Sequence, residues 1–427
     1  MNEVPVAGID VSKGKSDICV LAPDNSILFR AKVFHELDDM TRLVKRLSDV
    51  ETEYGARPVL VMEATGHYHR VLQNFLRDAG FEVLVINPIQ SCGLKNINIR
   101  KTKNDRIDAH RIAMLYRLKT IKPTNTPTEV LADLRMLCRQ HFDLVNDSVA
   151  YKNRLRAMLD QCFPAYDRVF SDIDGLASLS VLAHFPTPEI LLAATDSEIE
   201  NSIYIAVKRS QTFYNKKVAL LRKTAQNALP LCSNTASSGI LIRNLVSILK
   251  NFTDAIRETN LQIRRLIRSD EDVQHNVDLL TSIPGIADYS AAVILSEIGD
   301  FSSFQKPKQL VAFFGLDPSE RQSGTFKGTK NKISKRGSRY LRGILNMCAH
   351  VSIHPGCNGR YANPVLAAYF EKKCASKPYK SALCAVMHKL VNIVFAVLRD
   401  QKPFELRLPE EHCELMQQRS ALNKKIA

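Results

Sequence analysis

Four carboxylates stand where acidic side chains can act together on one substrate. Asp10 in GIDVSK and Glu63 in VLVMEATG each end or interrupt an apolar run, whereas Asp105 and Asp108 share the segment KTKNDRIDAHRIA. The three-residue step places the last two on one face of a helix. Because gathered carboxylates repel one another unless a cation joins them, the set predicts a divalent-metal site. Such a site suits phosphoryl chemistry on nucleic acid.

A serine in the segment ERQSGTFKG is the second candidate for chemistry. The hydroxyl of Ser323 becomes a useful nucleophile only if its proton is removed and the developing charge is stabilised. Neighbouring lysines and a bound metal would supply both effects against a phosphodiester. A serine in a polar turn is the commoner meaning of this pattern, and Ser334 and Ser338 occupy the same basic stretch. Spacing alone therefore leaves all three serines open.

Basic residues surround both candidates. The formal net charge is +15, and residues 321–342 hold eight Lys or Arg and no Asp or Glu. Residues 95–122 hold nine basic residues, with Asp105 and Asp108 as the only acids. Such runs favour a polyanionic partner. The predicted nucleic-acid contacts are Lys101, Lys103, Arg106, Lys327, Lys330, Lys332, Lys335, Arg336, Arg339 and Arg342. The last three recur every three residues, which predicts that they share one helix face.

The elements that position the acids follow from the apolar pattern. Strands are expected at 4–11, 16–21, 27–33, 59–62 and 82–86, and helices at 38–54 and 67–79. Three strands followed by alternating helix and strand is the order of an RNase H-like fold. In that fold the first acid lies on the first strand and the second acid on the fourth. We therefore predict an α/β RNase H-like (RuvC-like) domain over residues 1–125.

The rest of the chain is predicted to be mainly helical. A long amphipathic helix over 128–163 needs a partner, which a helix over 240–268 could provide. Residues 126–277 thus form a helical, coiled-coil middle region, in which 165–235 show short helical patterns and no chemistry. A C-terminal domain over 278–408 begins with two short helices joined at Gly285. This helix-hairpin-helix element would let backbone amides approach a phosphate. Residues 409–427 form a polar tail.

Composition excludes several classes of protein. A hydrophobic content of 45% over 427 residues is enough for two or three domains with real cores. Neither a stretch of transmembrane length nor a signal peptide is expected, so no membrane partner is predicted. The ten cysteines are scattered without a CxxC pair, which fits neither a zinc ribbon nor a disulfide framework. The sequence thus predicts a cytoplasmic protein with reduced thiols.

With these residues in place, the chain resembles transposases of the insertion sequence 110 family, which includes the pilin-gene invertases. The matching stretches include GIDVSK, VMEATGHYHR, KTKNDRIDAHRIA, IPGIADYSAAVILSEIGD, FFGLDPSERQSGTFKG, ISKRGSRYLR and SKPYKSALCAVMHKL. They cover nearly everything except residues 165–235. The resemblance implies that Asp10, Glu63, Asp105 and Asp108 form the family's DEDD tetrad, which binds one or two Mg²⁺ ions. It also implies that Ser323 is the catalytic serine of the C-terminal transposase domain.

The same resemblance implies how the reaction would run. Ser323 would attack DNA and form a covalent phosphoserine intermediate. A structured non-coding RNA from the element's own end would guide recognition of donor and target DNA, and the protein would act as a homodimer or a dimer of dimers. The predicted function is recombination that moves its own insertion sequence. Two alternatives stay open: a RuvC-like nuclease or junction resolvase that uses water, and a non-catalytic nucleic-acid-binding protein.

Overall fold

A computed structural model describes residues 4–64, 66–86, 105–118, 128–232, 236–319, 322–323, 326–327, 332–408, 410–411 and 414. At 105–106, 236, 322–323 and 326–327 only the backbone is described. The chain divides into two compact units, residues 1–126 and 127–427, which are described separately below.

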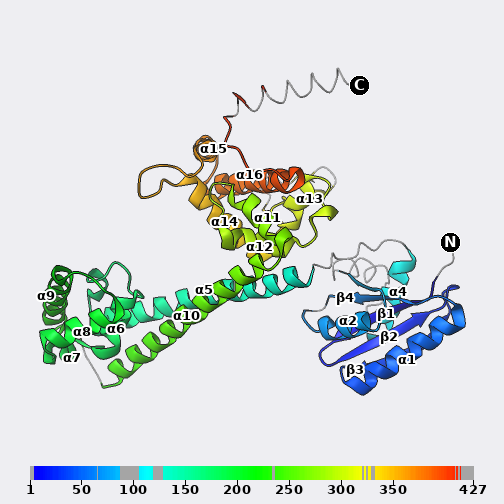
Figure 1. The fold of residues 1–427 in the computed structure, drawn as a ribbon, viewed down its shortest axis with the longest axis horizontal. Helices are drawn as coiled ribbons and strands as arrows, with labels where there is room; N and C mark the ends of the chain where they lie inside the picture. Colours follow the sequence, from blue (N-terminus) through cyan, green and yellow to red (C-terminus); the bar gives the residue numbers. More distant parts are fainter. Residues whose placement is uncertain are drawn as a thin grey trace. The chain divides into compact units, whose positions relative to one another are not determined.

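The N-terminal unit contains a five-stranded sheet (Figure 1). Its strands are β1 (Val6–Ser12), β2 (Lys15–Leu21), β3 (Ile27–Phe34), β4 (Val59–Glu63) and β5 (Val83–Ile86). Their order is β3-β2-β1-β4-β5, in which β2 pairs antiparallel with both β1 and β3, whereas β4 pairs parallel with both β1 and β5. Gly14, with a φ of 72°, makes the turn between β1 and β2. This topology confirms the predicted RNase H-like fold.

Helices cover both faces of this sheet. They are α1 (Leu37–Tyr54), α2 (His69–Asp78) and α4 (Asp105–Arg117). Along β1, Ala7, Ile9 and Val11 join one core with residues of α1 and α2. Val6, two residues of β4 and one face of α4 form a second core on the other side. Alternate side chains of each strand therefore point to opposite helical layers.

Gly8 sets how closely α4 approaches the sheet. A Cβ atom at Gly8 would lie 2.1 Å from the backbone oxygen of Ala109 and 2.5 Å from the backbone nitrogen of Ala113. Both contacts are with backbone, so neither can be relieved by turning a side chain. Glycine on β1 and alanines on α4 thus let the helix backbone lie directly on the strand.

Two long helices organise the second unit. They are α5 (Glu129–Cys162), whose N-terminus is capped by the Thr128 side chain, and α10 (Ala236–Arg268). α10 runs back along α5, as predicted (Figure 1). Leu134 near the start of α5 shares a core with Ile267 near the end of α10. Leu159 and Ile242, at the opposite ends of the same two helices, share a different core. That the pair is a coiled coil stays a prediction.

The region that the sequence left without a clear pattern forms a helical lobe around the second of these cores. Its helices are η1 (Tyr166–Arg168), α6 (Leu176–His184), α7 (Pro188–Ala193), α8 (Asp196–Ala206) and α9 (Gln211–Ala228). A full capping box at Thr195 and Glu198 begins α8. Tyr166 is buried and donates a hydrogen bond to the Ser178 carbonyl at 3.0 Å. The lobe is therefore a well-packed body and not an extended insertion.

The remaining helices pack around the first core. They are α11 (Glu271–Thr281), α12 (Asp288–Ile298), η2 (Phe301–Ser303), α13 (Pro307–Phe313), α14 (Arg339–Ile353), α15 (Pro364–Cys374) and α16 (Tyr379–Asp400). α16 has 22 residues and contains an 18-residue window with a mean hydropathy of 1.9, so the expectation that no apolar stretch reaches transmembrane length was wrong. Its apolar window is 56% buried, because Val386, Leu390 and Val394 belong to the core. Burial in this core accounts for its composition.

The turn between α11 and α12 packs inward. Gly285 has a φ of 102°, and a Cβ atom there would lie 2.2 Å from the Ser352 hydroxyl of α14. The same hydroxyl donates to the Pro284 carbonyl at 3.1 Å. Contact with α14 thus accounts for the glycine. A helix-hairpin-helix element that binds phosphate through Gly285 stays a prediction.

Candidate functional site

Two of the four candidate acids lie at the carboxyl ends of neighbouring parallel strands. Ile9 of β1 pairs with Met62 of β4, so Asp10 and Glu63 follow at the same level of the sheet. Gly8, two residues before Asp10, and Val61, two residues before Glu63, both face α4. By the alternation of strand side chains, Asp10 and Glu63 also point to the α4 side.

The third acid reaches this side of the sheet from α4. Asp108 immediately precedes Ala109, whose backbone oxygen lies over Gly8, and the carboxylate is only 9% exposed. Arg111 donates a hydrogen bond to Asp108 Oδ1 at 2.9 Å. Asp105 begins α4, but its side chain lies outside the described residues. We call Asp10, Glu63 and Asp108 the acid edge.

A fifth carboxylate beside the acid edge was missed by the sequence analysis. Asp17 of β2 is the cross-strand partner of Asp10, so both side chains share the α4 side. It is 5% exposed, and Lys32 of β3 stands opposite it on the next strand. The signal was available, because Asp17 and the buried Cys19 alternate with Ile18 in KSDICV.

The donor set at this edge suits a hard divalent cation. Carboxylate oxygens are the protein ligands that Mg²⁺ prefers, and Asp10, Glu63 and Asp108 come from three elements that meet there. Within the described residues, no group of three Asp, Glu, His or Cys side chains is close enough to hold a metal ion. Arg111 occupies an oxygen of Asp108, and the Asp105 side chain is outside the description. The residue types fit such an ion, and Asp10, Glu63 and Asp108 lie on the same side of the sheet.

A cation from β3 adds charge to the same side of the sheet. Burial raises the pKa of the Cys19 thiol, and a hydrogen bond from Arg30 acts in the opposite direction. Burial also lowers the pKa of the His110 imidazole on α4, with the nearby Arg30 guanidinium lowering it further. Arg30 therefore faces α4 next to the acids, where it can balance part of their charge.

The serine candidate lies in a hairpin of the second unit. β6 (Gln322–Ser323) and β7 (Phe326–Lys327) pair antiparallel, with Ser323 opposite Phe326. An isolated bridge between Pro318 and Ile333 closes the base. We call residues 318–333 the serine hairpin. The side chains of Ser323 and Lys327, and all of Lys330, lie outside the described residues.

Hydrogen bonds hold the base of the serine hairpin. The backbone nitrogen and the hydroxyl of Ser319 donate to the Lys332 carbonyl at 2.7 and 2.8 Å. The backbone nitrogen of Ser334 donates to the Asp317 carbonyl at 2.7 Å, and its hydroxyl to Asp317 Oδ1 at 2.5 Å. Main-chain bonds thus fix where the two short strands start.

The two rival serines have roles in the fold. Ser334 bonds Asp317 through its hydroxyl, as described above. Ser338 is the N-cap of α14, and its side chain accepts a hydrogen bond from the Leu341 backbone nitrogen. Both hydroxyls therefore have partners in the local structure.

The start of α14 corrects one prediction. α14 begins at Arg339, so Arg336 precedes the helix and does not share a face with Arg339 and Arg342. The interruption comes from Gly337, where a Cβ atom would lie 2.0 Å from the Phe313 carbonyl oxygen. The backbone at Gly337 lies against the backbone of Phe313 and is not helical, so α14 starts only after the Ser338 cap.

The other predicted contacts divide into free and engaged cations. Lys332, Lys335 and Arg336 are exposed. Arg339 bonds Asp143 of α5 at 2.8 Å, and Arg342 donates to the Gly337 carbonyl at 2.7 Å, so these two guanidinium groups also hold the fold together. Lys101, Lys103 and the Arg106 side chain lie outside the described residues. All ten contacts with nucleic acid stay predictions.

A sheet of this topology, with acids on its first and fourth strands, belongs to the RNase H-like class, which includes enzymes that cut and join nucleic-acid strands. Residues 7–164 match the DEDD transposase model of IS110, and residues 277–364 match the model described as "Transposase IS116/IS110/IS902 family". Together the two segments span more than half of the chain. The chain belongs to the IS110 family of transposases, which cleave and rejoin DNA.

Relatives support this assignment, two of them over nearly their full length. A protein of insertion element IS116 from Streptomyces clavuligerus is 24% identical over 93% of this chain and 95% of its own length. The transposase of insertion sequence IS1111A from Coxiella burnetii is 22% identical over 95% and 92% of the two chains. The pilin gene-inverting protein of Moraxella bovis is 29% identical over 49% of this chain and 62% of its own.

One solved structure that resembles part of this chain is RuvC of Thermus thermophilus in complex with a Holliday junction substrate. It is 16% identical, covers 28% of this chain and 99% of its own, and gives a TM-score of 0.21. The assignment of the N-terminal fold rests on the strand order and registers given above.

Proposed function

We propose that this transposase moves its own insertion sequence by attack of the Ser323 hydroxyl on a DNA phosphodiester, assisted by divalent metal at the acid edge. The observation that carries the proposal is the convergence of Asp10, Glu63 and Asp108 on the α4 side of the sheet, in a chain of this family. Carboxylates on neighbouring elements repel one another less when a cation lies between them, which supports a metal ion on this side of the sheet.

Mg²⁺ would be held by Asp10, Glu63, Asp108 and Asp105, and the chemistry it supplies when bound is stabilisation of negative charge at the scissile phosphate. The four carboxylates of the chain set its place and exclude other anions from it. Arg111 donates a hydrogen bond to Asp108 Oδ1 and would help to orient this carboxylate beside the ion. Whether one or two ions bind is part of the same proposal.

The serine step conserves the number of phosphodiester bonds. The Ser323 oxygen loses its proton and forms a bond to phosphorus, while one phosphorus–oxygen bond of the DNA strand breaks and releases a hydroxyl end. A hydroxyl of another strand end then attacks the phosphoserine and restores the serine. Bond energy is thereby kept in the intermediate for rejoining. The roles found for Ser334 and Ser338 support Ser323 as the nucleophile.

The partners follow from the same proposal. DNA at the element ends and at the target is the substrate, an element-encoded RNA guides the choice of site, and the protein works in the cytoplasm as a homodimer or dimer of dimers. Lys332, Lys335 and Arg336, all exposed beside the serine hairpin, supply phosphate contacts. Sequencing of the nucleic acid that copurifies with the full chain, and light scattering of the complex, test these partners directly.

The decisive experiment follows a covalent adduct. A labelled donor-end DNA is incubated with the protein, its RNA and Mg²⁺, then run on a denaturing gel with and without proteinase treatment. Wild type should give a product whose mobility depends on proteinase, and Ser323→Ala should give none while retaining DNA binding. Ser338→Ala is the matched control, because it removes a hydroxyl from the same segment and costs about 1 kcal/mol of helix capping. Strand cleavage that persists in Ser323→Ala would replace this proposal with a nuclease that uses water.

A further inference from the structure

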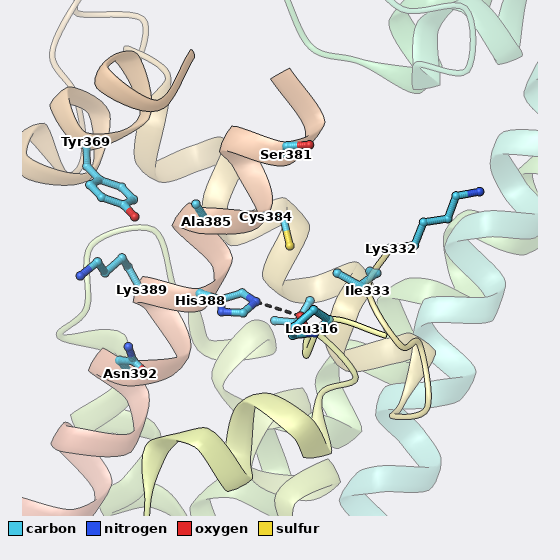
Figure 2. Close-up of a pocket in the computed structure, with 11 residues that line it drawn as sticks. Leu316, Lys332, Ile333, Tyr369, Ser381, Cys384, Ala385, His388, Lys389 and Asn392 are labelled. Atoms are coloured by element: carbon cyan, nitrogen blue, oxygen red, sulfur yellow. Dashed lines mark hydrogen bonds between the residues drawn. The ribbon is translucent and has the colours of Figure 1, made fainter. Parts of the chain in front are cut away.

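A pocket of about 350 Å³ lies at the base of the serine hairpin (Figure 2). One wall is a face of α16, formed by residues that recur at helical spacing: Ser381, Cys384, Ala385, His388, Lys389 and Asn392. The opposite face of α16 is buried in the core. Five of these six residues lie in SKPYKSALCAVMHKL, a segment to which the proposed strand transfer gives no role.

The other wall belongs to the loop that carries Ser323. It contains Pro318 and Ile333, which form the closing bridge of the serine hairpin, together with Leu316 and Lys332. His388 joins the two walls through a hydrogen bond of 2.9 Å between its Nε2 and the Leu316 carbonyl. Because a carbonyl only accepts, Nε2 carries the hydrogen, and in the neutral ring Nδ1 is an acceptor.

The lining has the character of a nucleotide site. It includes two lysines, which Figure 2 shows on opposite sides of the pocket, and no carboxylate. Most of its lining surface is apolar. Tyr369 of α15 contributes an aromatic ring, and the Lys389 amine lies 5.5 Å from the centroid of that ring. Asn392, Ser381 and His388 offer donors and acceptors for a polar edge. A base needs an apolar or aromatic surface and a few polar partners, and its phosphates need cations.

We infer that this pocket holds one unpaired nucleotide of the strand that the transposase acts on, with its base inside and its flanking phosphates towards Lys332 and Lys389. The inference rests on the proposed strand transfer, because a nucleotide anchored here would place the strand against the base of the loop that bears Ser323. Occupation of the pocket and position of the hairpin are coupled through the Pro318–Ile333 bridge and the His388 bond.

The test measures binding without chemistry. Fluorescence anisotropy in EDTA follows the full chain with a single-stranded DNA, the same sequence as RNA, and the duplex. Ala385→Phe fills the pocket without changing charge, and it should weaken single-strand binding about 5- to 100-fold, the loss of one stacked base, with an unchanged salt slope. Ala375→Phe, at an exposed position outside the pocket, should bind like wild type.

A charge variant covers the case in which the filled pocket perturbs folding. Lys389→Ala removes an exposed cation and should flatten the salt dependence of single-strand binding by about 0.7, the value for one phosphate contact. Lys402→Ala changes the same charge at an exposed site outside the pocket and should not. Bound strand should also protect Cys384 from alkylation, with the exposed Cys357 as internal reference.

The outcomes separate this inference from the proposed function. Binding by Ala385→Phe and Lys389→Ala that equals their controls would overturn the pocket and leave the covalent-adduct result untouched. A Ser323→Ala protein that still cuts DNA would overturn the serine reaction, whereas the binding measured in EDTA would still stand. Tighter binding of single-stranded DNA than of RNA is expected, and a preference for RNA, or for duplex over both single strands, would also overturn the inference.

Discussion

The acid edge and the serine hairpin place reactive groups by different physical means. At the acid edge, the register of two parallel strands and a helix backbone resting on Gly8 fix where the acids lie. The described part of the serine hairpin is held at its base, by backbone bonds to the preceding loop and by the contact with α16. Dense packing thus fixes the acid edge, whereas a few hydrogen bonds fix the base of the serine hairpin. The two should therefore respond differently to mutation.

The largest effect is expected from removing one acid. Asp10→Asn should abolish strand transfer, because the metal site loses a charged ligand, while the melting temperature without metal should hold or rise as carboxylate repulsion falls. Mg²⁺ at about 100 times its dissociation constant should stabilise wild type by about 2.7 kcal/mol, and the variant by much less. Thermal melts with and without Mg²⁺ measure this difference. The exposed Asp49→Asn is the control, and equal stabilisation of Asp10→Asn and wild type would refute the metal site.

Packing at the acid edge gives the next effect. Gly8→Ala should destabilise the protein by about 3 kcal/mol, because the new Cβ would collide with the Ala109 and Ala113 backbone and push α4 from the sheet. Denaturant unfolding measures the change. Gly239→Ala, where a Cβ would make only ordinary contacts with Pro186 and Thr187, should be neutral or stabilising. Equal stability of the two variants would show that α4 is not fixed by Gly8.

Ser334→Ala at the base of the serine hairpin should destabilise the protein less than Gly8→Ala does at the acid edge. Ser334→Ala removes a hydrogen bond to the Asp317 carboxylate and should cost about 1.5 kcal/mol. Because this bond anchors the hairpin base, the rate of adduct formation should fall several-fold while single-strand binding is kept. Ser319→Ala removes a bond to a neutral carbonyl of the same base and should cost less. An unchanged adduct rate in Ser334→Ala would mean that this bond does not position Ser323.

The smallest effect concerns the contact between α5 and α12. Burial lowers the pKa of His141 on α5, whose ring packs 4.2 Å from that of Tyr289. The unfolded chain therefore binds the proton more readily, so the free energy of unfolding should fall as pH drops below about 6.5, by at most about 1.4 kcal/mol per pH unit. His141→Phe should flatten this dependence in denaturant unfolding between about pH 7 and pH 5.

The exposed His275→Phe serves as the control for that measurement. A wild-type stability that rises on acidification, or a slope that persists unchanged in His141→Phe, would contradict the expected sign or its source.

Sequence patterns predicted the N-terminal sheet well because its strands alternate and its helices are amphipathic. The expected strand at 27–33 is found at Ile27–Phe34 and the expected helix at 38–54 at Leu37–Tyr54. The order of the acids along the chain placed Asp10 on the first strand and Glu63 on the fourth, as the structure has them.

Other features of the structure depend on contacts between residues far apart in the sequence, which the spacing of residues along the chain does not predict. The exclusion of Arg336 from α14 follows from the approach of Gly337 to Phe313, which are far apart in sequence. The position of Asp17 beside Asp10 follows from the register of β1 and β2, which the sequence alone does not give. The pocket beneath the serine hairpin joins loop residues to α16, and no local pattern connects the two. The division between a middle region and a C-terminal domain at residue 278 stays a prediction.

The lobe of α6–α9 also bears on how the chain reaches its fold. α5 and α10 pack against each other although residues 163–235 separate them, and closing a long flexible loop costs entropy that grows with its length. The core of the lobe includes Leu159 of α5 and Ile242 of α10, so its formation would bring the two helix ends together and shorten the effective loop. Folding of the long helix pair should then start at the lobe and proceed towards the core that contains Leu134 and Ile267, which makes the lobe a nucleus for folding.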